Sequence, residues 1–463
     1  MTSVEPRTPV TDQLAAYVSS VRSTEITAPV VDHTRRVVLD TLGCMLLGGT
    51  LPAGRVASRY VESFGGAQEA TVIGARLRAP APLAALANGT AAHADELDGV
   101  HRVSAHPAAI SVAAALAAAE SHGATGAELI AGVGLSFDVG CGLLDAFGGG
   151  HAMRRPPRHL HGSGFIAVGA AAAGAWLAGL DEDATRAALG IAPTGAAFPE
   201  GFVDEASHLA KAYAQGQAAA SGLTAVRLAA AGLRTNPTVF EARNGFADSW
   251  WHDEVDLAGL LARIRDHDHV LDNGFKYFSA GYAVQAPIAL SLGLMAAYGI
   301  AAGDVARVRV GMTTNSADKV DAVVIPGICL QDMLALAMVR GRLGHDDAHD
   351  PSALDDEAVA RLRSRIEVVR DPAKDAEDPQ SRSAWVSIET TSGACHTTAD
   401  ELPPGHWGRG GMPMADVAEK FRSLATPRIG AAAAQHVIDL VEDLGALDDV
   451  GELVAALAGT SGG

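Results

Sequence analysis

The sequence predicts a mainly helical protein that is interrupted by an α+β insert. Of its 463 residues, 48% are hydrophobic but only 5% are aromatic, and the apolar content is dominated by Ala, Leu and Val. Small side chains of this kind suit closely packed helices. The helical periodicity gives way near Gly274 to alternating apolar segments and returns near Met412. The chain is too long for one ordinary core, so we expect separate domains.

Helices are expected along the first part of the chain, where apolar residues recur at intervals of three and four. Segments with this spacing lie within 10–60, 82–94, 108–121, 126–144, 165–178, 182–191 and 209–231. A short extended or irregular piece that contains 70–73 is expected at 67–79, before two prolines. The glycine-rich segment 148–162 is predicted to be a loop. It follows no predicted strand and lacks the Lys-Ser/Thr ending of a phosphate-binding loop.

The insert is expected to combine strands with helices. Val308, Val310 and Met312 fall on one side of an alternating segment, which is typical of a strand. Further strands are expected at 366–369, 384–391 and 394–398, and helices at 282–298, 330–340, 355–364, 412–424, 431–444 and 452–457. We therefore predict a helical domain at 1–272, an α+β domain at 273–404, and C-terminal helices at 405–463 that rejoin the helical domain.

The charge and the cysteines exclude several classes of protein. The net charge of −19 argues against a nucleic-acid partner, because such a protein needs clustered Lys and Arg to neutralise phosphates. The four cysteines are widely spaced without a CxxC pair, which favours reduced thiols in a cytoplasmic protein. Residues 1–12 lack the features of a signal peptide. The uncharged segment 162–180 is mostly Gly and Ala, so we expect a buried helix and no membrane partner.

Titratable side chains are concentrated between His93 and His106. This stretch carries three carboxylates, three imidazoles and an arginine, directly before the alanine-rich run 108–119. An acid–base site fits best, because histidine exchanges protons near neutral pH and a neighbouring carboxylate can orient it. A solvated helix end with capping carboxylates is one alternative. A metal site formed by His93, Asp98 and His101 is another, but no HExxH-like pattern is present, so we expect no metal.

Lysine is scarce, since only five of the 35 basic residues are lysines. Lys211 and Lys276 lie in otherwise uncharged segments. An ammonium group there either pairs with an anion or has a lowered pKa, and both states suit the binding of a carboxylate or proton transfer. The alternative is a lysine whose stem packs while its head reaches water.

A basic segment, 154–161, offers a further candidate site. Its arginines, including Arg158, could hold an acidic substrate in two contacts each, although such a segment is also typical of a surface or an interface. His161 is the better candidate, because it directly precedes the expected buried helix.

Several blocks of the chain resemble the MmgE/PrpD family, which contains dehydratases, decarboxylases and epimerases of small carboxylic acids. The blocks are Ala87–Asp98 with His106-Pro107, then 179–191, 211–222, Phe275-Lys276 and 414–424, in the family's order. The resemblance implies a large helical domain built from both chain ends, a smaller α+β lid, and a homodimer. It also implies an active site between the domains that needs no metal and no organic cofactor.

The resemblance implies roles for five residues. His106 matches the family's proton-transferring histidine, and Lys211 and Lys276 match its two active-site lysines. Glu96 stands where decarboxylase members have an aspartate, and His161 matches the histidine ahead of the glycine-alanine helix.

The departures from the family pattern concern the substrate. Val100 stands where the decarboxylase has threonine, Asp332 stands where tyrosine is common, and Tyr282 belongs to a segment that lacks the family's cysteine, arginine and histidine. We expect these three residues and Arg158 to contact the substrate. Because a cation is lost and an acid gained, the pattern favours a smaller or less charged acid than a tricarboxylate.

The leading hypothesis is a cofactor-independent lyase of the dehydratase or decarboxylase type. It would abstract a proton alpha to a carboxylate or carbonyl group of a small carboxylic acid. An epimerase or isomerase that uses the same proton abstraction is the first alternative. A noncatalytic homologue that binds a metabolite is the second.

Overall fold

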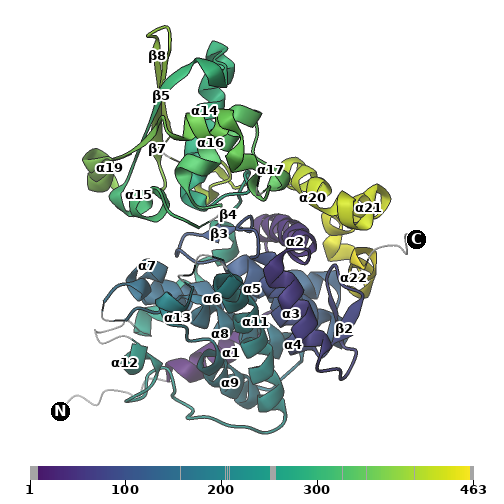
Figure 1. Ribbon diagram of the computed structural model, residues 1–463. Coiled ribbons are helices and arrows are strands. Elements are labelled where there is room, and N and C mark those ends of the chain that lie inside the picture. The colour runs from purple at the N-terminus through teal and green to yellow at the C-terminus, as the bar shows by residue number, and fades with distance from the viewer. Residues whose placement is uncertain are drawn as a thin grey trace, which may run out of the picture.

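The computed structural model describes residues 9–458, except for 157, 204, 206, 208, 251–256, 326, 351 and 401. The described residues form 22 α-helices and eight strands, which confirms the mainly helical class with a smaller α+β part. The α+β part lies above the helical part in Figure 1, and the last helices of the chain lie beside the first ones.

The larger part is helical and precedes residue 273. Its helices are α1 (Val10–Ser20), α2 (Ala28–Gly48), α3 (Pro52–Glu62), α4 (Ala81–Ala92), α5 (Pro107–His122), α6 (Gly126–Ala146), α7 (Gly149–Arg154), α8 (Ser163–Leu177), α9 (Glu182–Ile191), α10 (Glu200–Val203), α11 (Leu209–Ala230), α12 (Phe246–Trp250) and α13 (Leu257–Arg265). A two-stranded hairpin, β1 (Ala70–Val72) and β2 (Leu77–Ala79), lies between α3 and α4. The predicted loop 148–162 contains α7, which begins after Gly148 in a left-handed conformation.

Small residues allow the central helices to approach closely. A Cβ atom added to Gly216 of α11 would meet the carbonyl oxygen of Leu86 in α4 at 2.1 Å, and one added to Gly89 would meet Gly216 at 2.9 Å. Only glycine fits where two backbones are this close. The contact places the beginning of α11 beside the end of α4, where two of the candidate site residues lie.

The α+β part is built on a four-stranded sheet in the order β6 (Ile366–Arg370), β5 (Val305–Met312), β7 (Ala384–Thr390) and β8 (Cys395–Asp400). Strands β5 and β6 are parallel, and the other neighbours are antiparallel. As predicted, Val308, Val310 and Met312 are buried, while Arg307 and Arg309 are exposed. The helices of this part are α14 (Tyr282–Tyr298), α15 (Thr314–Val320), α16 (Leu330–Arg340), α17 (His345–Ala348), α18 (Glu357–Arg363) and α19 (Pro372–Glu377).

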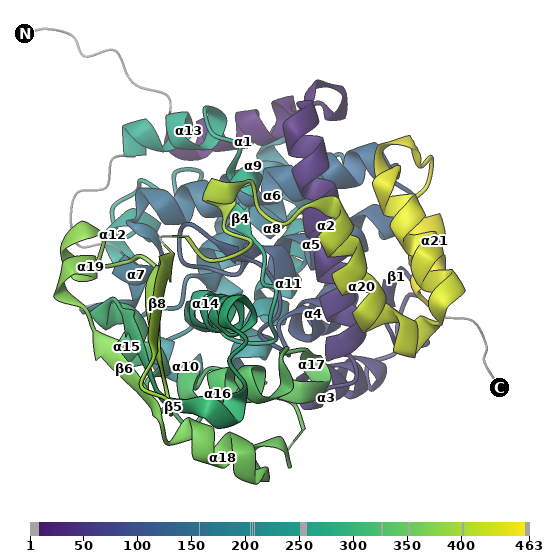
Figure 2. The same ribbon diagram turned by 90° about the horizontal axis from the view of Figure 1, so that it is seen from above.

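The C-terminal helices α20 (Met414–Ile429), α21 (Ala431–Glu442) and α22 (Gly451–Leu457) return to the helical part. Figure 2 shows α20 alongside α2, and a Cβ atom added to Gly43 of α2 would meet the ring of Phe421 at 3.2 Å. The main hydrophobic cluster accordingly contains residues from both chain ends, such as Leu14 and Leu457. A second cluster, which includes Val308, forms the core of the α+β part.

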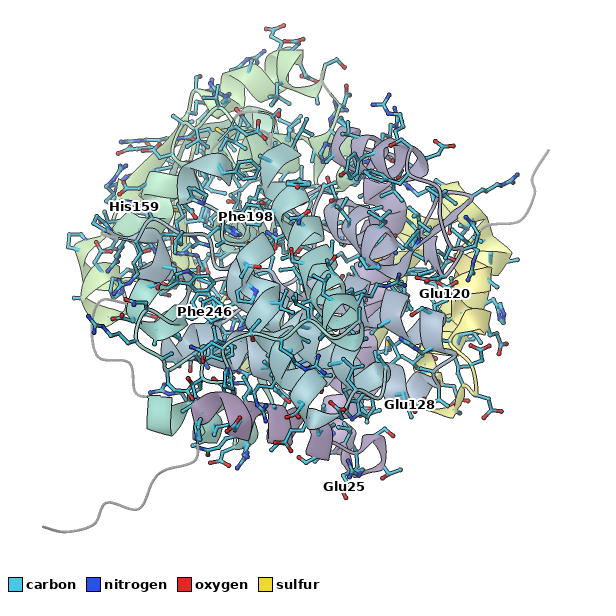
Figure 3. The ribbon with its side chains drawn as sticks, turned by 90° about the horizontal axis from the view of Figure 1, so that it is seen from below. Glu25, Glu120, Glu128, His159, Phe198 and Phe246 are labelled. Carbon is cyan, nitrogen blue, oxygen red and sulfur yellow. The ribbon has the colours of Figure 1, made fainter. Side chains whose placement is uncertain are left out.

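Helix α6 is a core helix. It begins with a capping box, in which the Thr125 side chain accepts a hydrogen bond from the Glu128 amide and the Glu128 carboxylate accepts one from the Thr125 amide. Figure 3 labels Glu120 and Glu128, at the neighbouring ends of α5 and α6. Among single helices of the described chain, α6 alone is long and apolar enough to cross a membrane, and 83% of its most apolar window is buried inside the protein.

Two contacts tie the helical and α+β parts together near the candidate site. Strand β3 (Val100–His101) pairs with β4 (Asn273–Gly274), so that the turn after α4 lies against the beginning of the α+β part. Asp95 of the same turn pairs with His345 and His349 at α17. Both contacts lie at the junction of the two parts, where β3, β4 and α17 are drawn in Figure 1.

Candidate active site

The turn between α4 and α5, residues 93–106, contains the first group of candidate residues. Glu96 lies in it with a φ angle of +56°, a left-handed conformation that costs a non-glycine residue on the order of 1 kcal/mol. Its buried carboxylate pairs with both candidate lysines. Lys211 Nζ contacts Oε1, and Lys276 Nζ lies 3.1 Å from Oε2 and also donates to the Glu96 carbonyl oxygen. One carboxylate thus holds two ammonium groups from distant parts of the chain.

Lys276 is fully buried, and the chain around it is fixed by Gln285 of α14. The Gln285 Oε1 atom accepts hydrogen bonds from the Tyr277 and Phe278 amides at 3.0 and 3.1 Å. Its Nε2 atom donates to the Phe278 and Ala280 carbonyl oxygens, each at 2.9 Å. A single buried side chain therefore holds the loop that follows Lys276, and that loop in turn positions the ammonium group at Glu96.

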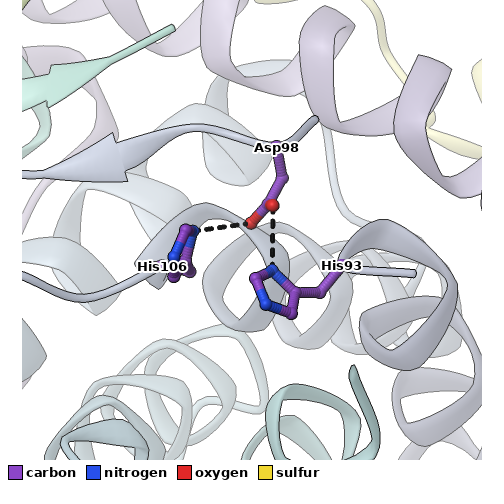
Figure 4. A group of neighbouring side chains, drawn as sticks. All are labelled: His93, Asp98 and His106. Carbon is purple, nitrogen blue, oxygen red and sulfur yellow. Dashed lines mark hydrogen bonds and ion pairs between the residues drawn. The ribbon is translucent and has the colours of Figure 1, made fainter. Parts of the chain in front are cut away.

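Asp98 holds two histidines (Figure 4). His93 Nδ1 lies 2.9 Å from Asp98 Oδ1, and His106 Nδ1 lies 3.4 Å from Oδ2. Burial alone would raise the pKa of Asp98, but His93 and His106 lower it, so the carboxylate stays ionised. Burial alone would lower the pKa of His93, whereas Asp98 and Glu96 raise it. Asp98 is therefore the fixed anion of the cluster.

His106 is held as a neutral base. Its Nδ1 atom donates to the Gly99 carbonyl oxygen at 3.0 Å, and its Nε2 atom makes no hydrogen bond to a described residue. Burial, acting with His93 and Lys276 against the attraction of Asp98, lowers the pKa of His106 to about 4. The imidazole is therefore neutral at pH 7, with an available lone pair on Nε2.

His161 presents the opposite nitrogen state. The Ser163 amide donates to His161 Nδ1 at 3.4 Å, and the Ser163 hydroxyl lies 2.9 Å from the same atom. The amide can only donate, so Nδ1 is the acceptor and Nε2 carries the proton. Burial, with Arg154 and Lys211 nearby, holds the pKa of His161 well below its ordinary value. His161 is thus a neutral donor.

A cavity of about 470 Å³ between the two parts brings most of the candidates together. Its lining includes Glu96, Val100, His106, His161, Lys211 and Tyr282. Lys276 does not line it but contacts Glu96 from behind. The Tyr282 hydroxyl is buried without a hydrogen-bond partner among the described residues, and burial raises its pKa. It is available to a ligand as a donor.

Two of the expected substrate-contacting residues lie elsewhere. Asp332 does not line the cavity, because Arg363 of the neighbouring helix α18 binds its carboxylate. Arg158 is also outside the lining, and its guanidinium donates to the Ala152 carbonyl oxygen at 3.4 Å. The expectation of a less charged substrate depended partly on an Asp332 carboxylate inside the site. Because this carboxylate lies outside the cavity, it does not support that expectation.

The cavity also contains residues that sequence reasoning did not select. Arg154, Lys319 and Arg382 line it and add positive charge, and Trp407 stacks on Tyr282 with ring centroids 6.3 Å apart. Lys319 lies on α15, a short helix that was not predicted. The scarcity of lysine was the signal that could have identified it, since that argument applied to all five lysines.

The donor atoms of His93, Asp98 and His106 lie within 4.8 Å of one another, which is close enough to hold a cation. His101, which the alternative metal site required, instead groups with His269 and Asp272. The Nδ1 atom of His106 carries a proton, because it donates to a carbonyl oxygen, so this nitrogen is not a metal ligand in that hydrogen-bonding state.

Comparison with known proteins identifies the family. The N-terminal domain of the MmgE/PrpD family matches residues 12–257, and its C-terminal domain matches residues 278–445. The chain belongs to the MmgE/PrpD family. Human cis-aconitate decarboxylase is 25% identical to this MmgE/PrpD protein over 98% of the chain and 95% of its own length.

Two further relatives show the same level of similarity. The mouse cis-aconitate decarboxylase is 25% identical over 98% of this chain and 94% of its own. The cis-aconitate decarboxylase-like protein oryM of Aspergillus oryzae is 25% identical over 99% of both chains. The similarity to this MmgE/PrpD protein therefore extends over the whole of each relative.

Proposed function

We propose that this MmgE/PrpD protein is a cofactor-independent lyase that acts on a small carboxylic acid by proton abstraction alpha to a carboxylate or carbonyl group. The observation that carries the proposal is the pairing of a neutral basic nitrogen, His106 Nε2, with the Lys211–Glu96–Lys276 cluster around one cavity. The relatives named cis-aconitate decarboxylase make decarboxylation the first reaction to test.

His106 acts as the base. Its Nε2 lone pair takes a proton from the carbon next to the activating group, and the C–H electron pair moves toward that group. The imidazolium that results is stabilised by Asp98, which already lies 3.4 Å from Nδ1. A positioned general base of this kind contributes about 10²–10⁴-fold in rate.

Lys211, which lines the cavity, faces the negative charge that develops on the substrate, and Lys276 contacts Glu96 from behind. The two ammonium groups share the single carboxylate of Glu96, so the cluster keeps a surplus positive charge. Fixed cations in a site of low dielectric constant lower the barrier to forming an enolate-like intermediate, because they need no reorganisation as the charge appears.

His161 supplies the second proton transfer through Nε2–H. In an elimination, the carbon–oxygen bond breaks, its electron pair leaves with the hydroxyl group, and His161 protonates that group as water. In a decarboxylation, the carbon–carbon bond to the lost carboxylate breaks and its electron pair stays on the substrate. The His106 imidazolium returns the proton that it took, and His161 supplies the proton that replaces carbon dioxide. Both outcomes use the same side chains.

The test is incubation of the purified protein with cis-aconitate and with 2-methylcitrate in heavy water, followed by NMR. Loss of carbon dioxide with deuterium in its place, or loss of water with formation of a double bond, supports the lyase. Deuterium exchange without the loss of a group would identify an epimerase or isomerase. Tight binding of an acid with neither reaction would identify a noncatalytic binding protein.

A further inference from the structure

Lys319 and Arg382 differ from the other cations of the cavity in having no anionic partner. In the described part of the chain, Lys319 makes no hydrogen bond and no ion pair. Arg382 donates only to the Ser316 hydroxyl at 2.9 Å and to the Ser381 carbonyl oxygen. Both line the cavity and both belong to the α+β part. A chain with a net charge of −19 therefore keeps two unneutralised cations in its cavity.

The neighbouring cations are neutralised within the protein. Arg102 pairs with Asp145 and Asp272, at 3.1 and 2.7 Å. Arg154 pairs with Glu200 at 3.1 Å. Arg102 and Arg154 therefore join parts of the cavity wall through ion pairs, whereas Lys319 and Arg382 line the cavity without an ion pair to a described residue.

The lack of an anion carries an electrostatic cost. Although Lys319 is an exposed residue, partial desolvation of its ammonium group, together with Arg382 and Arg154, lowers its pKa to about 7, against the attraction of Glu200. Burial and Arg154 lower the pKa of Arg382 to about 10. An anion bound between these groups would offset the repulsion and restore the charged form of Lys319. The unpartnered Tyr282 hydroxyl lines the same cavity and offers the anion a neutral donor.

We propose that Lys319 and Arg382 form a carboxylate-binding subsite for a substrate carboxylate that is remote from the reacting carbon. The inference rests on the proposed function and assigns to it two residues that select the substrate. It reverses the expectation of a weakly charged acid, because Asp332 is neutralised by Arg363 outside the cavity and Lys319 and Arg382 supply the positive charge.

The subsite divides the work between the two parts of the protein. The helical part carries the groups that move protons, whereas the α+β part carries the cations that select the substrate. The planar guanidinium of Arg382 can hold a carboxylate through two N–H groups, and Lys319 adds a point charge. A substrate with two carboxylates would then bridge the junction of the two parts.

The experiment measures binding without turnover. Isothermal titration calorimetry at pH 6.5 compares tricarballylate, which has three carboxylates, with butyrate, which has one. The variants are Lys319→Gln and Arg382→Gln, and Arg361→Gln is the matched control, because it removes an exposed arginine of α18 in the same part of the protein. We expect the affinity for tricarballylate to fall about tenfold or more in each subsite variant and to remain unchanged in the control, with butyrate little affected throughout.

Three results would overturn the subsite. They are unchanged tricarballylate binding in both folded variants, an equal loss for butyrate, and tighter Lys319-dependent binding of inorganic phosphate than of tricarballylate. Thermal melting checks that each variant folds. If Arg382→Gln does not fold, Arg382→Lys replaces it, because lysine keeps the charge but lacks the planar guanidinium. We expect Arg382→Lys to weaken tricarballylate binding by a smaller factor. Unchanged tricarballylate binding in both Arg382→Lys and Lys319→Gln counts against the proposal. The binding assay needs no reaction, so it tests the subsite separately from the lyase activity. If the protein binds tricarballylate through Lys319 but converts no acid, the lyase proposal is wrong and the subsite proposal stands.

Discussion

His106 donates its Nδ1 proton to the carbonyl oxygen of Gly99, at 3.0 Å. The two residues belong to the same turn, so the backbone itself selects the tautomer with a free lone pair on Nε2. Asp98 adds the charge that an imidazolium would need. Local chain geometry therefore sets which nitrogen of His106 is basic, and the residue lines the cavity.

Replacement of His106 by alanine removes the proposed base. We expect His106→Ala to lower turnover at least roughly tenfold, as the loss of a general base does, while the fold stays intact because the His106 side chain does not cap α5. His122→Ala is the matched control, since His122 is the exposed last residue of the same helix. Steady-state kinetics on both variants checks the prediction, and wild-type turnover in His106→Ala would remove His106 from the mechanism.

Replacement of Lys211 tests the cationic cluster. Lys211→Ala removes the ammonium group that lines the cavity and leaves Glu96 with Lys276 and His93, so the positive charge that faces the substrate is lost. We expect turnover to fall at least roughly tenfold with little change in melting temperature, because the Lys211 side chain is partly exposed. Lys374→Ala should retain wild-type turnover, because the only hydrogen bond of this lysine side chain to a described residue is with the Ser383 hydroxyl. Equal activities of the two variants would argue against a role for Lys211.

The activity is expected to be highest on the acid side of neutrality. His106 must be neutral to act as a base, and its pKa of about 4 predicts that kcat/KM falls below that pH. Lys319 must be charged to bind a carboxylate, and its pKa of about 7 predicts that kcat/KM falls as the pH rises above that value. The groups that face Lys319 are Arg382, Arg154, Glu200 and Lys211.

A pH profile of kcat/KM in the wild type and in Lys319→Gln distinguishes the decline at low pH from the decline at high pH. The glutamine variant should lose the decline above pH 7 and keep the one near pH 4, where His106 is affected by Asp98, His93 and Lys276. Persistence of the alkaline decline in Lys319→Gln would assign it to another group.

The sequence predicts the long, regular elements well, because their apolar spacing is repeated over several turns. Helices α14 and α16 lie at the predicted residues 282–298 and 330–340. Helix α15 was missed because seven residues with the sequence TNSADKV repeat no apolar pattern, and Lys319 was missed with it as a cavity residue. Asp332 shows a different limit. A matched position does not fix the direction of a side chain, and Arg363 holds this one away from the cavity.

Gln285 is expected to matter for both stability and turnover. Gln285→Leu removes four hydrogen bonds to the loop that follows Lys276, and of the four backbone groups only the Phe278 carbonyl keeps another partner among the described residues, the Ala280 amide. Each buried group left without a partner costs about 1–3 kcal/mol, so we expect a clear fall in melting temperature and, in the folded protein, a fall in kcat. Gln435→Leu, on the exposed face of α21, is the control and should change neither quantity much. A destabilised Gln285→Leu protein with unchanged kcat would limit Gln285 to a purely structural role.

The contact between Asp95 and the two histidines at α17 predicts a pH-dependent link between the parts of the protein. Burial alone would raise the pKa of Asp95, but hydrogen bonds from His345 and His349 lower it. Burial alone would lower the pKa of His349, whereas Asp95 raises it above the ordinary 6.5. The contribution of Asp95 to stability is present above its ordinary pKa of 3.8 and is lost as the pH falls through the lowered pKa. The contribution of His349 is present below pH 6.5 and is lost as the pH rises through the raised pKa.

Asp95→Asn should therefore lower the free energy of unfolding most between about pH 4 and 6.5, by roughly 1–3 kcal/mol, because a buried hydrogen bond between charged groups is replaced by a neutral one. Denaturant unfolding of the wild type and the variant at pH 5.5 and pH 8.5 measures the difference, which should shrink at the higher pH. Asp355→Asn removes an exposed carboxylate of the α+β part and should give a small difference at both values. If the Asp95→Asn difference were the same at pH 5.5 and pH 8.5, the histidines would not be charged partners of Asp95, and the Ser279 hydroxyl, 2.8 Å away, would be its principal contact.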